Sequence, residues 1–223
     1  MSAPTAAANP WLSWDYLENN WSDVARYTGQ HVSLTVEAVL AAIVIAVPLA
    51  LLAHRLPALG AAAVGTSAVL YTVPSLALFG LLVPLTGIGR TTVLIGLTAY
   101  ALLVLVRNTL VGLQGVPPDV VDAARGMGYS PARRLLTVEL PLALPAVITG
   151  VRLATVSTVA LVTVGVVVGY GGLGQLMYRG FNSGYRAEIM TAALLCLGIA
   201  LVADLVLLAL GRAVTPWLRR RSR

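Results

Sequence analysis

Charged residues are scarce in this sequence. Asp, Glu, Lys and Arg make up 11% of the 223 residues, whereas apolar residues make up 58% and the mean hydropathy is +0.85. Water-soluble globular domains carry about 25% charged and about 45–50% apolar residues. The chain has too little polar surface to cover a water-soluble particle, so we predict an integral membrane protein.

Lysine is absent, and cysteine and histidine are rare. All fifteen basic residues are arginine, so the chain lacks the lysine that a P-loop places on nucleotide phosphates. This absence excludes ATP hydrolysis by a P-loop of its own. The single Cys196 excludes an internal disulfide and a cysteine-based metal site, and His31 and His54 have no ligand-like neighbours in the sequence. We therefore expect no catalytic constellation, no metal and no bound cofactor.

Long apolar runs dominate the chain instead. A membrane-spanning helix needs about 20 mostly apolar residues, and five runs approach or exceed this length. They cover residues 32–52, 60–83, 91–106, 142–168 and 188–210. The third run is short, but Arg90 and Arg107 flank it and can extend to the two interfaces. The sequence therefore predicts an all-α integral membrane protein, a five-span helix bundle with its termini on opposite sides.

The placement of arginine predicts the orientation of the bundle. Ten arginines lie in segments on one side of the five-span arrangement and four on the other, while Arg152 lies inside the fourth run. Because cytoplasmic segments carry the excess of basic residues, we expect the 108–141 loop and the C-terminus in the cytoplasm. The predicted organisation is an extracytoplasmic segment (1–29), a transmembrane domain (30–212) and a basic cytoplasmic tail (213–223).

Aromatic residues are few, and several of them cluster before the first span. They recur at roughly helical spacing, at Trp11, Trp14, Tyr16 and Trp21, with Leu17 beside them. This pattern predicts a short amphipathic helix lying in the outer headgroup layer. A disordered tail with incidental aromatic residues is the alternative.

The one long polar segment, residues 108–141, lies between the third and fourth runs. Pro117 and Pro118 end a preceding helix and suit the first turn of a new one, where Asp119 also favours the helix dipole. Gly126 and Gly128 then predict the end of this short helix.

A second short helix is predicted in the same loop. Ser130 and Pro131 are typical of an N-cap and a first helical position, and we expect the helix to cover 132–140 and to be closed by Pro141. The loop is therefore predicted to form a helix–turn–helix bracket. Its small residues and arginines suit docking into another protein.

The loop resembles the EAA loop of permease subunits of ATP-binding-cassette importers. That family's pattern is Glu-Ala-Ala, three residues, Gly, nine residues, Ile, any residue and Leu-Pro. This chain matches every spacing, with Asp in place of Glu and Val in place of Ile. The resemblance implies a coupling loop that contacts the ATPase subunit through Asp122, Ala123, Ala124, Gly128, Glu139, Leu140 and Pro141.

A second match lies between the fourth and fifth runs. Residues 169–174 contain four glycines, which let the backbone turn back on itself. The segment resembles the outer re-entrant segment of permeases that import glycine betaine, carnitine or choline, and of related methionine permeases. Residues 71–78, 107–109 and 139–145 are more similar to the osmoprotectant branch.

Several residues are candidates for the translocation path or for polar contacts within the spans. Pro74 is expected to kink the second span, where it either lines the path or only shapes packing. Glu37 and Glu188 are expected at solvated outer ends, whereas Arg152 and Asp204 could pair. The path residues that we predict are Tyr71, Pro74, Ser75, Gly171, Gly172 and Gly174.

The resemblance implies the permease subunit of a cell-membrane importer that moves a glycine betaine, choline or carnitine type of solute by alternating access. A methionine or other amino-acid permease is the alternative, and a secondary transporter or a membrane scaffold lies outside the superfamily. The implied partners are a second permease copy or paralogue, two ATPase subunits that use the ATP, and a separate extracytoplasmic substrate-binding protein. No enzymatic activity and no nucleic acid are expected.

Overall fold

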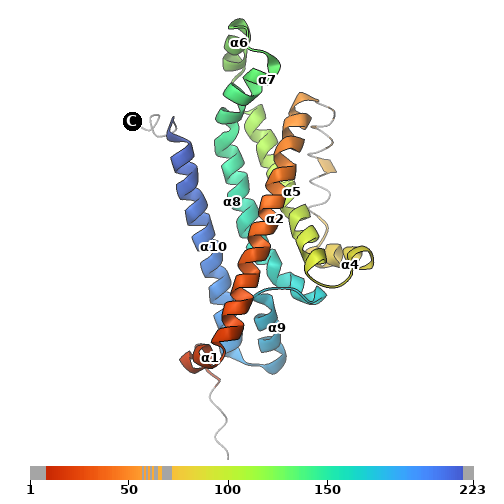
Figure 1. The fold of residues 1–223 in the computed structure, drawn as a ribbon, viewed down its shortest axis with the longest axis vertical. Coiled ribbons are helices and arrows are strands. Elements are labelled where there is room, and N and C mark those ends of the chain that lie inside the picture. Colours follow the sequence, from red (N-terminus) through yellow and green to blue (C-terminus); the bar gives the residue numbers. More distant parts are fainter. Residues whose placement is uncertain are drawn as a thin grey trace, which may run out of the picture.

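A computed structural model of the chain describes residues 9–56, 58, 60, 62, 65–66 and 72–217. All regular secondary structure in these residues is helical. Four of the described helices are long and apolar enough to cross a membrane: α2 (Trp21–Arg55), α5 (Arg90–Gln114), the continuous helix Pro131–Val168, and α10 (Arg186–Val214). They run side by side in Figure 1. The all-helical membrane fold is confirmed, and the count of five spans stays a prediction.

The packing of α2 is based on its smallest residues. One face of the helix repeats alanine every four residues, and all four of these alanines are fully buried: Ala38, Ala42, Ala46 and Ala50. Most of this face shares one cluster with Leu105 of α5 and Ala154 of α8. Because alanine lets helix backbones approach closely, α2 lies against both partners along much of its length.

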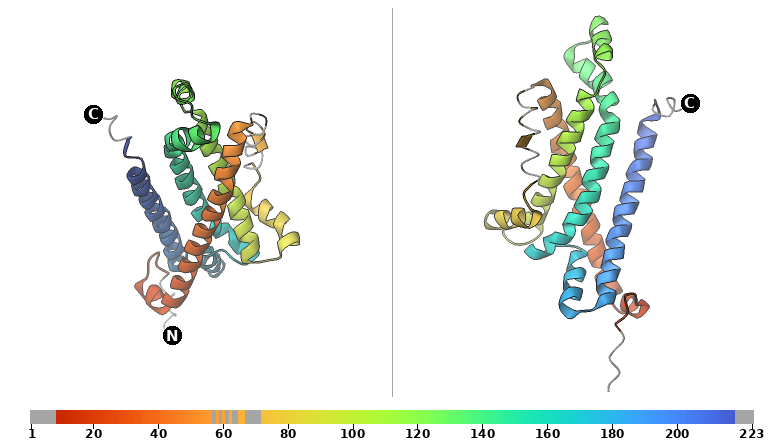
Figure 2. Two further views of the ribbon diagram at one scale, coloured as in Figure 1. Left: turned by 45° about the horizontal axis from the view of Figure 1, so that its top comes forward. Right: turned by 180° about the vertical axis from the view of Figure 1, so that it is seen from behind.

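The second predicted span does not continue as one helix. Residues 72–74 are not helical, and α4 (Ser75–Thr86) lies across the bundle rather than along it (Figures 1 and 2). Pro74 lacks an N–H and immediately precedes α4, so it separates the two parts instead of kinking one helix. The Tyr100 hydroxyl donates to the Val73 carbonyl and fixes this break. Much of the first half of the predicted span, including Tyr71, lies outside the described residues.

The third predicted span is longer than its apolar run. Helix α5 extends to Gln114, because Leu110 and Leu113 continue its buried face beyond the charged Arg107. The first residues of the predicted 108–141 loop are therefore helical.

Pro141 does not close a second short helix, so that prediction is wrong. Helix α7 (Pro131–Arg134) continues through the π-helical turn η1 (Leu135–Glu139) into α8 (Leu140–Val164). In the π turn the Leu140 N–H donates to the Leu135 carbonyl, five residues back. Pro141 then occupies the first turn of α8, where its missing N–H costs little.

Helix α10 lies at one side of the bundle and is joined to α8 by an ion pair. The guanidinium of Arg152 donates from Nε and Nη2 to the two carboxylate oxygens of Asp204, each at 2.8 Å. The expected pairing of these residues is confirmed. Two parallel hydrogen bonds fix the geometry of the contact as well as its charge.

Helices α1 (Trp14–Asn19) and α9 (Gly174–Ser183) lie at the opposite end of the bundle from α6 and α7 (Figure 1). The predicted short helix before the first span is confirmed. Trp11, Trp14 and Trp21 are exposed, but Tyr16 is only 4% exposed and packs edge-on against Tyr185. Tyr16 therefore packs inward, while the three tryptophans form the exposed side of this segment.

Candidate functional site: the bracket and the glycine turn

In the structure, the predicted bracket comprises residues 118–139. It begins with α6 (Pro118–Gly126), which projects beyond the long helices (Figure 1). Asp119 lies in its first turn and Arg125 in its last, which suits the helix dipole. Asp122 and Ala123 are exposed, whereas Ala124 is buried against the rest of the bracket. The Asp122–Arg125 pair (3.0 Å) lies on the surface of this helix.

A tight turn joins α6 to α7. The chain leaves α6 through Gly128, whose φ of 77° is in the left-handed region that favours glycine. Ser130 then accepts a hydrogen bond from the Arg133 N–H, which caps α7 as predicted. A Cβ at Gly128 would meet nothing within 4 Å, so the requirement for glycine is conformational rather than steric.

Three side chains from two distant parts of the chain form what we call the clamp. The Arg134 Nε donates to Glu139 Oε1 at 2.5 Å, and the His54 Nε2 lies 2.9 Å from Glu139 Oε2. Glu139 is only 3% exposed, so both of its oxygens are satisfied in a buried position. His54 is in the last turn of α2, so the clamp joins α2 to the base of the bracket.

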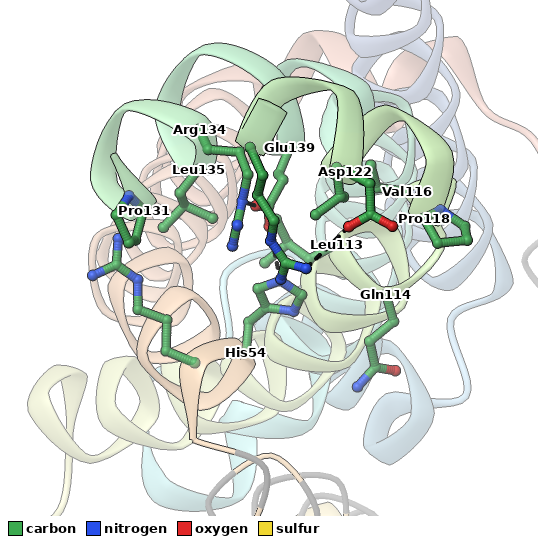
Figure 3. A pocket seen from close by; sticks show the side chains of 13 residues that line it. His54, Leu113, Gln114, Val116, Pro118, Asp122, Pro131, Arg134, Leu135 and Glu139 are labelled. Carbon is green, nitrogen blue, oxygen red and sulfur yellow. Dashed lines mark hydrogen bonds and ion pairs between the residues drawn. The ribbon is translucent and has the colours of Figure 1, made fainter. Parts of the chain in front are cut away.

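The bracket and the end of α2 enclose a hollow of about 580 Å³, the bracket cavity. Figure 3 shows Arg134, Glu139 and His54 directed toward one another along it. Its charged or titratable lining residues come from α2, α6 and the segment 131–139, and they are His54, Arg55, Asp122, Arg125, Arg134 and Glu139.

The glycine turn (residues 169–174) is the second predicted feature. The chain leaves α8 through the 3-10 turn η2 (Gly165–Val168) and reverses at Gly169, which has a φ of 81°. A Cβ on Gly171 would overlap the Val166 backbone, and one on Gly174 would overlap the Thr163 carbonyl. These two glycines therefore place α9 directly against the end of α8.

His31 connects the glycine turn to two helices. Its Nδ1 accepts a hydrogen bond from the Leu173 N–H at 3.3 Å, and its Nε2 lies 3.0 Å from the Val159 carbonyl. Since Nδ1 accepts, the proton resides on Nε2 and is donated to Val159. Gly172 (φ 53°) packs on His31, where a Cβ would come within 2.8 Å of the histidine Cβ.

An ionic network lies beside the glycine turn. Arg179 of α9 donates to Glu188 at 2.5 Å and to Asp23 of α2 at 2.9 Å. Glu188 is 4% exposed, so its expected solvated position is wrong, because α9 folds back over the start of α10. Burial, with the nearby Glu188 carboxylate, raises the pKa of Tyr16 to about 12. Glu37 remains at the surface, paired with Arg90.

The structure divides the predicted site residues into separate groups. Asp122, Ala123 and Gly128 are exposed together on the bracket, whereas Glu139 is buried at its base and Leu140 and Pro141 are half-buried. Among the predicted path residues, Pro74 and Ser75 lie at the start of α4, and Gly171, Gly172 and Gly174 lie in the glycine turn. Tyr71 lies outside the described residues.

Sequence reasoning missed His31 and His54. Each bonds to residues more than 80 positions away, and no local pattern marks such a partner. The only signal in the sequence was that the two histidines flank the same apolar run, residues 32–52.

Comparisons with known proteins find relatives that match most of the chain. The chain is 39% identical to the osmoprotectant import permease protein OsmW of Salmonella typhimurium, over 90% of this chain and 96% of that one. It is 33% identical to the carnitine transport permease protein OpuCB of Listeria monocytogenes, over 93% and 95% of the two chains. A choline transport system permease protein of Bacillus subtilis, OpuBB, is 31% identical over 90% and 93%.

A solved structure has the same fold. It is described as showing inward-facing conformations of the MetNI methionine ABC transporter, and it superposes with a TM-score of 0.78 at 23% identity, over 92% of this chain and 100% of that one. The family model for the inner membrane component of binding-protein-dependent transport systems matches residues 38–220. The chain therefore belongs to the family of inner membrane components of binding-protein-dependent transport systems.

Proposed function

We propose that this chain is the permease subunit of an importer for compatible solutes of the glycine betaine, carnitine or choline type. The observation that carries this proposal is the agreement among relatives. Permeases named for carnitine, choline and osmoprotectants match at 31–39% identity over at least 90% of the chain. The similarity to the methionine transporter is lower in identity and supports the fold alone.

In this proposal the bracket is the surface that receives the ATPase. The exposed Asp122, Ala123 and Gly128 would contact an ATPase subunit, while Glu139 holds the bracket to α2 from inside. The ATPase subunits bind and hydrolyse the ATP, and the solute is delivered by a separate binding protein. A second permease copy or paralogue completes the path, so two brackets meet two ATPase subunits.

The proposed orientation places the bracket in the cytoplasm and α1 and α9 outside. The arginine distribution supports it, because the bracket and the end of α2 carry Arg55, Arg125, Arg133 and Arg134. Closure of the ATPase dimer would bring the two brackets together. The clamp would then pass this movement to α2, which packs along α5 and α8.

Uptake by reconstituted complexes tests the solute class. The chain would be purified with the products of the neighbouring genes and placed in vesicles loaded with ATP. We expect uptake of labelled glycine betaine, carnitine or choline and none of methionine. The control is the same complex without ATP. Uptake of methionine alone would overturn the solute class, and uptake without ATP would overturn the importer mechanism.

A further inference from the structure

The bracket cavity carries an excess of positive charge. Three arginines line it against two carboxylates, so arginine exceeds carboxylate by one formal charge among these five groups. Both carboxylates are already engaged, since Glu139 is held by Arg134 and His54 and Asp122 is paired with Arg125. The cavity therefore has no uncommitted carboxylate to oppose an anion.

Arg55 is the lining arginine whose charge is not neutralised. It is the last residue of α2, its side chain is exposed, and the described residues offer it no ion pair. In the part of the chain that the structure describes, Arg134 donates only from its Nε to Glu139, and Arg125 donates only from its Nη1 to Asp122. Each guanidinium has five N–H donors, so all three arginines keep donors for a further acceptor.

The cavity is large enough to admit a phosphate group together with the molecule that carries it. A volume of about 580 Å³ is within the range of small-molecule sites. The cavity lies where α2 and α5 end, lined by Arg55 of one helix and by Leu113 and Gln114 of the other. In the orientation proposed above, on which this step rests, the cavity lies at the cytoplasmic end of the bundle, where a lipid headgroup and a free phosphate compound are both available.

We propose that the bracket cavity binds a phosphate-type anion, held by Arg55 together with Arg125 and Arg134. Guanidinium groups recognise phosphate oxygens through paired, charge-assisted hydrogen bonds. Such an anion would bridge α2 and the bracket, the same two elements that the clamp joins. It would therefore strengthen the connection through which the bracket moves α2.

The test separates the two sources of phosphate. Calorimetry would measure binding of inorganic phosphate and pyrophosphate to the whole permease in detergent, at ionic strength matched with sodium chloride. In parallel, native mass spectrometry would count phosphatidylglycerol retained by permease released from nanodiscs, against nanodiscs of phosphatidylcholine alone. Binding in the first arm identifies a free phosphate compound, and retention only in the second identifies a lipid headgroup.

In whichever arm binds, Arg55→Gln should weaken binding about tenfold, the loss expected for one charge-assisted contact. Arg107→Gln removes the same charge from a position outside the cavity lining and should change nothing. Gln114→Glu is a second variant, for use if Arg55→Gln fails to fold. It keeps Arg55 and adds a carboxylate to the cavity lining, so it should also weaken binding of the anion.

The proposal is overturned if neither arm shows binding, or if Arg55→Gln and Arg107→Gln behave alike. It is also overturned if binding disappears on assembly with the ATPase and Arg55 crosslinks to an acidic residue of that subunit, because the cavity would then be a protein contact. None of these results depends on which solute is transported, so they leave the proposed function untouched.

Discussion

At the bracket, side chains 85 positions apart join two parts of the chain, whereas at the glycine turn backbone packs directly on backbone. The clamp consists of polar groups that can rotate, exchange partners or be replaced by similar groups. The contacts of Gly171 and Gly174 leave no space even for a methyl group. The comparison shows that the α9 end is held by backbone packing that leaves no space for a side chain, while the bracket end is held to α2 by polar side chains.

The largest expected effect is at the glycine turn. Gly174→Val should destabilise the fold by about 3 kcal/mol, because the added atoms overlap the Thr163 backbone, which no rotamer change can relieve. Thermal unfolding in detergent and the yield of membrane-inserted protein would measure the loss. Gly198→Val is the matched control, since a Cβ there meets nothing within 4 Å. Equal stability of the two variants would show that the turn is not fixed by backbone packing.

A smaller loss is expected at the clamp. Glu139→Ala removes the acceptor of both Arg134 and His54 and should cost about 2 kcal/mol, less than a fully buried pair because both partners reach solvent. Glu139→Gln keeps one carbonyl acceptor and should cost roughly half as much. The amount of solute moved per ATP should fall in the same order. If Glu139→Ala moves the normal amount of solute per ATP, the clamp does not take part in coupling transport to ATP hydrolysis.

Gly128→Val should affect stability less than transport. Placing valine at a φ of 77° costs about 1–2 kcal/mol, and the turn should shift while the spans remain inserted. We expect uptake to be abolished because the bracket no longer fits the ATPase. Gly126→Val has ordinary φ and open space, so its unfolding temperature should remain near wild type. If Gly128→Val transports normally, the docking role of the bracket is wrong.

The smallest effect on the fold is expected for a pair of labelling variants that test which end is cytoplasmic. Arg133→Cys and Ser13→Cys would be made in a Cys196→Ser background and treated with an impermeant thiol reagent on intact cells. Arg133 is exposed, whereas Ser13 accepts a hydrogen bond from the Tyr16 N–H at the start of α1, so only Ser13→Cys should cost stability, by about 1 kcal/mol in this short helix. Labelling at 13 but not at 133 is expected, and the reverse pattern would invert the proposed orientation.

Local signals in the sequence predicted the first helix of the bracket and the turn after it. Pro118, Gly128 and Ser130 each act through their own backbone chemistry, so their roles could be recognised without the rest of the fold. Pro141 misled for a specific reason: proline commonly ends a helix, but a preceding π turn lets it begin the next one. The sequence correctly indicated that Pro74 interrupts the second predicted span. The direction of α4 across the bundle could not be predicted, because it depends on contacts with α5.

Contacts between distant residues could not be predicted in the same way. The four-residue alanine repeat of α2 indicates a packed face, but it does not say which helices cover it. His54 gives no sign in the sequence that Glu139 is its partner, and His31 none that it meets Val159 and Leu173. These pairings follow from the order in which the helices pack, which hydropathy alone leaves open.

The alanine face of α2 also bears on how fast the permease can change shape. An interface of interlocking large side chains must switch rotamers before two helices can tilt past each other. Ala38, Ala42, Ala46 and Ala50 have no side-chain torsions to switch, and burying them costs no rotamer entropy. Their side of the contact therefore adds no rotamer barrier when α2 changes its crossing angle, and any such barrier comes from larger partner side chains such as Leu105 and Leu110.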